Sequence, residues 1–160
     1  MSCYRNILVA LDGSPDAEAA LRHAVTLARD QNARLTLLSV VPRPPVPTGA
    51  GVAPPPDLTE SHAALLRRAL EAVPGDVGVT TRLEHGDPAA AILARVAEGA
   101  FDLVVMGSHG HSRVHRALLG SVSERVLKAA TVPVLLMRAG HGATVQRWQE
   151  TATTSLSAQG

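Results

Sequence analysis

The sequence predicts a single α/β domain, built as a five-stranded parallel sheet with helices on both faces. Short, nearly continuous apolar runs, as in strands buried on both sides, alternate along the chain with segments of helical periodicity. The chain has 160 residues, which is the length of one domain with one hydrophobic core. A regular alternation of strand and helix favours parallel pairing, because each helix then crosses over the sheet.

The composition is that of a globular protein. Hydrophobic residues make up 46% of the chain and the formal net charge is +1, so we expect no general nucleic-acid-binding surface. One Trp, one Tyr and one Phe are too few for a base-stacking platform. Cys3 is the only cysteine, no signal peptide is evident, and no apolar run approaches the ~18 residues of a membrane span. We therefore expect a cytoplasmic protein that binds neither membranes nor nucleic acids.

The first strand is predicted at residues 6–11, where the chain reads NILVAL. A D-G-S-P turn follows, in which Ser14 is a favourable N-cap and Pro15 suits the first helical position. The helix is expected over residues 15–29 on the basis of its apolar stripe, and the second strand over residues 34–41.

Residues 42–56 are rich in proline and cannot form a helix or a central strand. We interpret this segment as a mobile connector within the domain; a proline-rich docking segment is the alternative. The next helix is expected over residues 57–72, with Asp57 and Glu60 at the spacing of a capping box.

The third strand is predicted at residues 77–83, where polar and apolar residues alternate as they do at a sheet edge. Asp87 then caps a helix that has Pro88 at its first position and ends near Glu98, before Gly99.

The stretch from 102 to 138 contains a fixed glycine frame, G-x-x-G-x9-G, followed by a serine. Gly107 and Gly110 follow a buried strand at 103–106. Both glycines can take backbone angles that other residues avoid, and without side chains they let a ligand approach the main chain. Gly120 and Ser121 precede the next helix, and a helix start presents unpaired amides that hold phosphate. The frame therefore predicts a cradle for a polyphosphate.

That helix is expected over residues 121–130, with Ser121 and Glu124 at capping-box spacing, and the last strand over 132–137. Pro133 cannot donate a ladder hydrogen bond, so this strand belongs at an edge or an interface. An apolar edge strand needs a cover, which predicts a homodimer.

The order of elements fits a flavodoxin- or Rossmann-like sheet with strand order 3-2-1-4-5. In that order the first and fourth strands are neighbours at the switch point, where ligands bind. The loop with Asp12 and the loop with Gly107–Gly110 then share one crevice. We assign residues 1–139 to this domain and 140–160 to a polar tail without periodicity, in which Trp148 is either incidental or a contact with a partner subunit.

The frame and the segments VVMGSHG, LLGSVSERVLKAA and VPVLLMR resemble the ATP-binding members of the universal stress protein family. The resemblance covers nearly all of residues 4–138. It implies the flavodoxin-like sheet, a bound ATP and a homodimer that pairs through strand 132–137. It also implies contacts of Asp12 with the ribose, an adenine pocket walled by Ala10, Val40 and Met106, and phosphate contacts from Gly107, Gly110, Gly120, Ser121, Val122 and Ser123.

His109 lies in the same loop as His111, Arg113, His115 and Arg116. The simplest interpretation is a solvated basic loop. A flexible clamp for the phosphate anions is the functional alternative, with His109 as the residue assigned to the nucleotide site. A zinc site is disfavoured, because no Cys or carboxylate completes a ligand set at the usual spacing.

The chain lacks the G-x-x-x-x-G-K-[ST] motif and its phosphate-binding lysine. It also shows no evident base that would activate water for phosphoryl transfer, so we expect ATP binding with at most slow hydrolysis. Mg²⁺ is expected only alongside the phosphates. The alternatives are a slow ATPase or nucleotidyl-transfer enzyme on the same fold, and a family member that binds no nucleotide and acts through protein contacts. A flavin-binding protein is disfavoured by the scarcity of aromatic residues.

Overall fold

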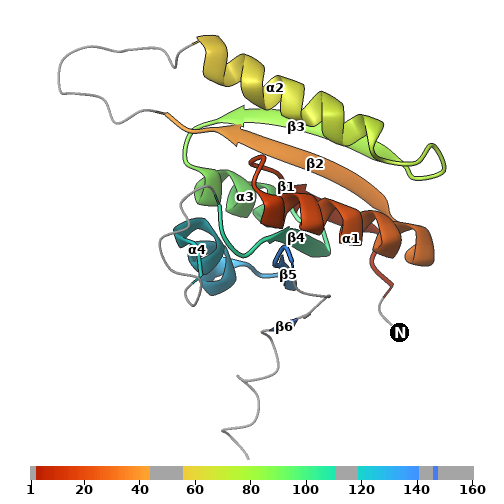
Figure 1. Ribbon diagram of the computed structural model, residues 1–160. Coiled ribbons are helices and arrows are strands. Elements are labelled where there is room, and N and C mark those ends of the chain that lie inside the picture. The colour runs from red at the N-terminus through yellow and green to blue at the C-terminus, as the bar shows by residue number, and fades with distance from the viewer. Residues whose placement is uncertain (1–2, 44–55, 111–118, 141–145, 148–160) are drawn as a thin grey trace, which may run out of the picture.

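The computed structural model describes residues 3–43, 56–110, 119–140 and 146–147. Helices cover a six-stranded sheet in the order β3-β2-β1-β4-β5-β6 (Figure 1). β1 to β5 are parallel, which confirms the predicted five-stranded sheet and its order. The strands are β1 (Asn6–Ala10), β2 (Arg34–Val41), β3 (Val79–His85), β4 (Leu103–Gly107), β5 (Val134–Met137) and β6 (Gln146–Arg147). The helices are α1 (Pro15–Gln31), α2 (Pro56–Glu71), α3 (Pro88–Ala97) and α4 (Ser121–Ala129).

The hydrophobic core is divided between the two faces of the sheet, because side chains alternate along each strand. Ile7 of β1 belongs to the cluster that α1 and α2 cover, together with Leu66. Leu8, the next residue, belongs to the opposite cluster, with Ile92 of α3 and Val126 of α4. Both β1 side chains are fully buried. The continuous apolar runs in the sequence are therefore strands that are covered on both sides.

The helix starts predicted for α1 and α3 are confirmed. Ser14 Oγ accepts a hydrogen bond from Ala17 N at 3.2 Å, and Asp87 Oδ2 accepts one from Ala90 N at 2.8 Å. The capping box predicted for α2 is wrong. This helix begins at Pro56, so Asp57 already lies in its first turn, and Glu60 Oε1 accepts from Arg67 at 2.6 Å instead of from the backbone.

β3 lies at one edge of the sheet and is partly exposed, as its alternating sequence predicted. It begins at Val79, two residues after the predicted start. Val77 N donates instead to Pro74 O at 3.0 Å, so that residue belongs to the preceding turn. Figure 1 shows α2 running along β2 and β3 on this side of the molecule.

The opposite edge of the sheet differs from the prediction. β5 was expected at an edge or an interface, but β6 pairs with it in antiparallel register, opposite Leu135 and Leu136. The segment after residue 139, expected to have no regular structure, thus contributes a two-residue strand. The predictions for the proline-rich connector at 44–55, for the basic loop at 111–118 and for Trp148 lie outside the described residues. Within the described ranges, no helix is long and apolar enough to cross a membrane.

Candidate functional site

A cavity of about 330 Å³ lies where the carboxyl ends of β1, β2 and β4 meet the first turns of α1, α3 and α4. This is the switch point of the sheet, between the neighbouring strands β1 and β4. Every residue assigned to the site from the sequence lines it: Ala10, Asp12, Val40, Met106, Gly107, His109, Gly110, Gly120, Ser121, Val122 and Ser123. Residues from four separate stretches of the chain therefore share one cavity.

One wall of the cavity is apolar. Val40 and Met106 are buried members of the core cluster beneath α3 and α4, and Ala10 packs against that cluster. Further residues line the cavity that the sequence did not assign to the site: Leu11, Ser14, Ala17, Leu38, Pro88 and Ile92. Leu38 precedes Val40 by two residues and so faces the same side of β2. Pro88 and Ile92 are four residues apart and so share one face of α3. Because the strand order places the start of this helix beside the crevice, their spacing could have predicted that they line it.

Asp12 stands at the end of β1 and lines the polar side of the cavity. Its Oδ1 accepts a hydrogen bond from Ser14 N at 2.9 Å, which fixes the carboxylate over the turn into α1. Gly110 approaches it from the loop after β4. A Cβ added to Gly110 would lie 2.9 Å from Asp12 Oδ2. The two loops that the sequence placed in one crevice are therefore in direct contact.

Close approach of neighbouring atoms, and not an unusual backbone angle, is the common feature of the glycine frame. None of Gly107, Gly110 and Gly120 has a positive φ. Gly107 also lies within β4 and does not form the turn after it. A Cβ on Gly107 would lie 2.8 Å from both Ala17 N and Asp16 Cβ, so only glycine lets β4 pack against the first turn of α1.

Gly120 closes the cradle from the side of α4. Its N–H donates to Ser108 O at 2.9 Å, and a Cβ there would lie 3.3 Å from the same oxygen. This hydrogen bond joins the two ends of the loop, at residues 108–110 and 119–123, whatever course the intervening residues take. The glycine frame thus lets the main chain after β4 and the main chain at the start of α4 approach each other beside the cavity.

The start of α4 differs from the predicted capping box. Gly120 is the N-cap and supplies no side-chain hydrogen bond, so Ser121 lies inside the helix. Glu124 Oε1 accepts from Lys128 Nζ at 2.8 Å and is not a capping residue. Ser123 Oγ, which is buried, donates to Gly107 O at 2.9 Å and so fastens α4 to the end of β4. A glycine N-cap leaves the first amides of α4 without a side-chain acceptor from that residue, which suits an anion.

Behind the cavity lies a buried polar cluster that the sequence did not reveal. Asp16 is only 8% exposed, although it occupies the first turn of a surface helix. Its Oδ2 accepts from Ser108 Oγ at 3.0 Å and from His109 N at 3.2 Å, and His109 Nδ1 lies 3.3 Å away. Its Oδ1 accepts from Ala139 N at 2.8 Å. Asp16 therefore holds the loop after β4 and the residues after β5 together.

Burial raises the pKa of Asp16, but the hydrogen bonds from Ala139, Ser108 and His109 outweigh this effect and hold it below its ordinary value. The carboxylate is therefore charged at neutral pH. Over the described part of the chain, no group of three or more His, Cys, Asp or Glu side chains is arranged to hold a metal ion. Asp16, Ser108, His109 and Ala139 form a hydrogen-bonded cluster around one charged carboxylate.

Comparisons with known proteins identify relatives along nearly the whole chain. Residues 3–138 match the model of the universal stress protein family. A putative universal stress protein of Staphylococcus haemolyticus is 36% identical over 143 residues, which cover 86% of this chain and 87% of the relative. The solved universal stress protein UspA from Lactobacillus plantarum is 28% identical, with a TM-score of 0.69 over 86% of this chain and 100% of that one. Universal stress proteins solved with cAMP, dAMP and AMP share the fold at 24%, 24% and 20% identity.

Proposed function

Because the chain belongs to the universal stress protein family, we propose that its cavity binds an adenine nucleotide, ATP foremost, and that the protein is a nucleotide-responsive regulatory or protective factor in the stress response. One observation carries the proposal: a carboxylate, a glycine frame and a glycine-capped helix start converge on a single cavity with an apolar wall. Its volume of about 330 Å³ lies in the range of small-molecule sites. The relatives solved with cAMP, dAMP or AMP add weight to the adenine nucleotide.

Each part of the cavity has a role in this proposal. Ala10, Val40 and Met106 form the apolar wall for the adenine ring. Asp12 accepts hydrogen bonds from the ribose hydroxyls, because a carboxylate at the end of a strand suits that contact. The phosphates lie along the backbone amides of the frame and of the α4 start, contributed by Gly107, Gly110, Gly120, Ser121, Val122 and Ser123, with His109 beside them. Mg²⁺ would accompany the phosphates, since carboxylate cages for it are not needed when the phosphates supply ligands.

The proposal is for a binding protein with at most slow hydrolysis of ATP. Asp16 accepts hydrogen bonds from Ser108 Oγ, His109 N and Ala139 N, and Glu124 pairs with Lys128, so neither carboxylate is placed as a base for an attacking water. A slow ATPase or nucleotidyl-transfer enzyme is the second candidate. Turnover well above background that is lost on replacement of a polar cavity residue would favour it. We place the protein in the cytoplasm, where ATP is abundant.

The test is to denature the purified protein, chromatograph what it releases, and titrate the emptied protein with MgATP. Gly110→Val places a side chain against Asp12 and should abolish binding while the fold survives. Gly75→Val is the matched control, because a Cβ there meets nothing within 4 Å and the residue has no positive φ. Released adenine nucleotide, or ATP binding that only Gly110→Val removes, would support the proposal. Absence of both in the unaltered protein would leave a family member that acts through protein contacts.

We also propose that two copies pair through the strand at residues 132–137. The apolar β5 has one edge along β4 and the other along the two residues of β6. A second copy would have to displace β6 or pair beside it. Light scattering should therefore find more dimer for a chain ending at residue 140 than for the full chain at equal concentration. A monomer at high micromolar concentration in both forms would refute the dimer.

A further inference from the structure

We propose that Asp16 is a positioning residue that couples the nucleotide cradle to the start of the C-terminal segment, so that a change at either place alters the other. The inference rests on the proposed nucleotide site for its functional meaning. Its structural basis is independent of any ligand. One buried carboxylate accepts hydrogen bonds from two parts of the chain that are far apart in sequence, and it adds to the pairing of β4 with β5 a link that reaches beyond the ends of both strands.

The two oxygens of Asp16 serve different segments. Oδ1 accepts from Ala139 N at 2.8 Å, and Oδ2 accepts from Ser108 Oγ at 3.0 Å and from His109 N at 3.2 Å. A carboxylate is planar and rigid, so rotation that improves the bonds of one oxygen displaces the other. Any shift of the Ser108–His109 backbone is thereby transmitted to Ala139.

The cradle end of this connection lies against the proposed phosphate site. His109 lines the cavity, and Ser108 O accepts from Gly120 N at 2.9 Å, at the start of α4. Ser108 N donates to Met137 O at 2.8 Å, so the same residue also contacts the end of β5. If the loop after β4 moves towards a ligand, Ser108 and His109 move with it, and their hydrogen bonds to Asp16 and Met137 must change.

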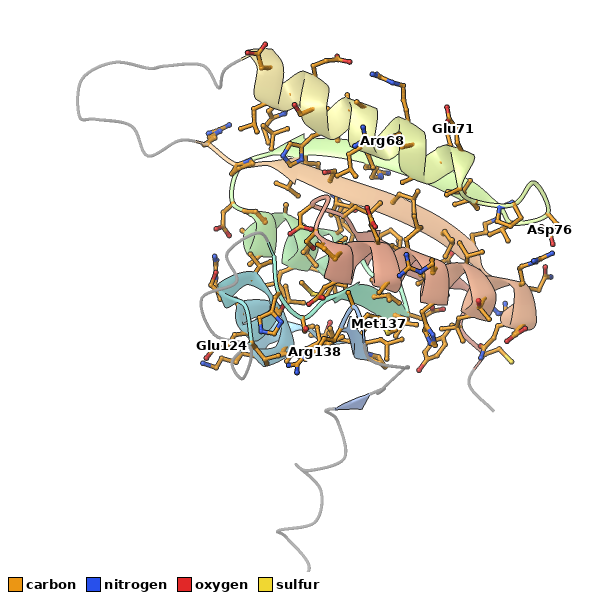
Figure 2. The ribbon with its side chains drawn as sticks, in the orientation of Figure 1. Arg68, Glu71, Asp76, Glu124, Met137 and Arg138 are labelled. Atoms are coloured by element: carbon orange, nitrogen blue, oxygen red, sulfur yellow. The ribbon has the colours of Figure 1, made fainter. Side chains whose placement is uncertain are left out.

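The other end lies outside the cavity. Ala139 does not line it, and follows Met137 and Arg138 where the chain leaves β5 (Figure 2). The next residue, Gly140, has a φ of +80°, and β6 returns along β5 a few residues later. Asp16 thus fixes the point from which the C-terminal segment departs towards the edge of the sheet.

Gly107 explains why the carboxylate is held so firmly. A Cβ on Gly107 would lie 2.8 Å from Asp16 Cβ, so β4 is in contact with the side chain at its base. Asp16 also lies in the first turn of α1, where the helix dipole favours a negative charge. Its side chain is 11% exposed. Water therefore competes little for the oxygens of Asp16. If one hydrogen bond is lost, water does not readily replace it, and the positions of the remaining partners change.

The first experiment follows amide hydrogen exchange in the nucleotide-free full-length protein. In Asp16→Asn, one end of the side-chain amide becomes a donor, so the residue cannot accept from both segments. We expect exchange at Ser108–His109 and at Ala139–Gly140 to speed up together, by about tenfold. Asp30→Asn, on the exposed end of the same helix, is the control and should change neither. Faster exchange in only one of the two segments, or in neither, would overturn the inference.

The second experiment asks whether the coupling reaches the nucleotide. Ala139→Pro removes the N–H that Oδ1 accepts without touching the cavity. MgATP affinity should fall by about 5- to 50-fold in both Ala139→Pro and Asp16→Asn, which lies within the range of ordinary allosteric coupling. Unchanged affinity in Ala139→Pro, with the unaltered protein binding normally, would refute the coupling. Failure of the unaltered protein to bind any adenine nucleotide would instead refute the proposed function, and the exchange data would still decide the role of Asp16.

Discussion

Two helices, α1 and α4, begin at the same cavity, but the first amides of their backbones are capped differently. α1 begins with Ser14, whose side chain accepts from Ala17 N, and its first turn carries the buried Asp16. α4 begins with Gly120, which has no side chain and gives no side-chain capping bond. The Ser14 side chain satisfies one of the first amides of α1, whereas a glycine N-cap supplies no side-chain acceptor to the first amides of α4, which suits an anion. The contrast is the basis on which we propose a structural role for the start of α1 and a binding role for the start of α4.

The start of α3 supports this division. Asp87 caps it and also accepts a hydrogen bond from Arg125 of α4 at 2.8 Å, so this carboxylate is engaged twice. The bond from Arg125 and the one from Ala90 N hold the pKa of Asp87 below its ordinary value. Of the three helix starts that line the cavity, only that of α4 is without a side-chain cap.

The largest effect is expected when an internal cap is added to α4. Gly120→Asp supplies a carboxylate that can accept from the first amides, so it should stabilise the helix start while weakening ATP binding by about 100-fold. The φ of Gly120 is −63°, which any residue can adopt. Gly120→Ala is the matched control, because its Cβ meets the same neighbours without an acceptor. Calorimetric titration of both variants decides the case; equal affinities would assign the amides no role in binding.

A second variant tests how tightly β4 packs against the first turn of α1. Gly107→Ala places a methyl group 2.8 Å from the main chain of the first turn of α1, where no flexible side chain can yield. We expect a loss of about 1–3 kcal/mol in the free energy of unfolding, as for other overpacked sites. Denaturant unfolding measures it, with Gly75→Ala as the control. A neutral result would show that the contact between β4 and α1 can adjust, and that Gly107 is present for another reason.

A smaller effect is expected at the cap of α1. Ser14→Ala removes the acceptor for Ala17 N and should lower the free energy of unfolding by about 1 kcal/mol. Its backbone N–H, which holds Asp12, is retained, so ATP affinity should change little. Unfolding and binding are measured on the same preparation. A large loss of affinity with unchanged stability would reverse the roles assigned to the two helix starts.

The sequence predicted the sheet order, the capped starts of α1 and α3, and a site whose residues line one cavity. These features follow from local patterns, because apolar runs, turn residues and glycine spacing are visible in the chain itself. The role of Asp16 could not be predicted in this way. In the sequence it resembles an exposed acidic residue in the first turn of an amphipathic helix, and it is buried only because the ends of β4 and β5 pack over it.

Local sequence patterns also could not predict why glycine occupies the positions of the glycine frame. A positive φ and a close approach both favour glycine, and only the position of α1 against β4 and of Asp12 against Gly110 distinguishes them. β6 was missed because a two-residue strand has no periodicity. Its pairing with β5 depends on where the chain leaves Ala139, which is a property of the tertiary structure.

The smallest effect concerns pH and the charge of Asp16. Hydrogen bonds hold its pKa below the ordinary value of 3.8, despite burial. A carboxylate with a lowered pKa stabilises the fold above its unfolded pKa, and this contribution is lost as the pH falls through the folded value. The difference in the free energy of unfolding between the unaltered protein and Asp16→Asn should therefore be constant from pH 7 to about 5 and shrink below about 4.

Denaturant unfolding at pH 7, 5, 4 and 3 would measure this difference. His109 is the titratable side chain in contact with Asp16, so the pair is also compared in a His109→Gln background, which removes any contribution of the imidazole. Asp30→Asn controls for the general loss of one negative charge. A difference that persists unchanged to pH 3 would mean that the shape of the side chain, and not its charge, holds Ser108 and Ala139 together. Packing of the Asp16 side chain, and not its charge, would then hold the surroundings of the first turn of α1 in place. The contrast between the starts of α1 and α4 would rest on the Ser14 cap alone.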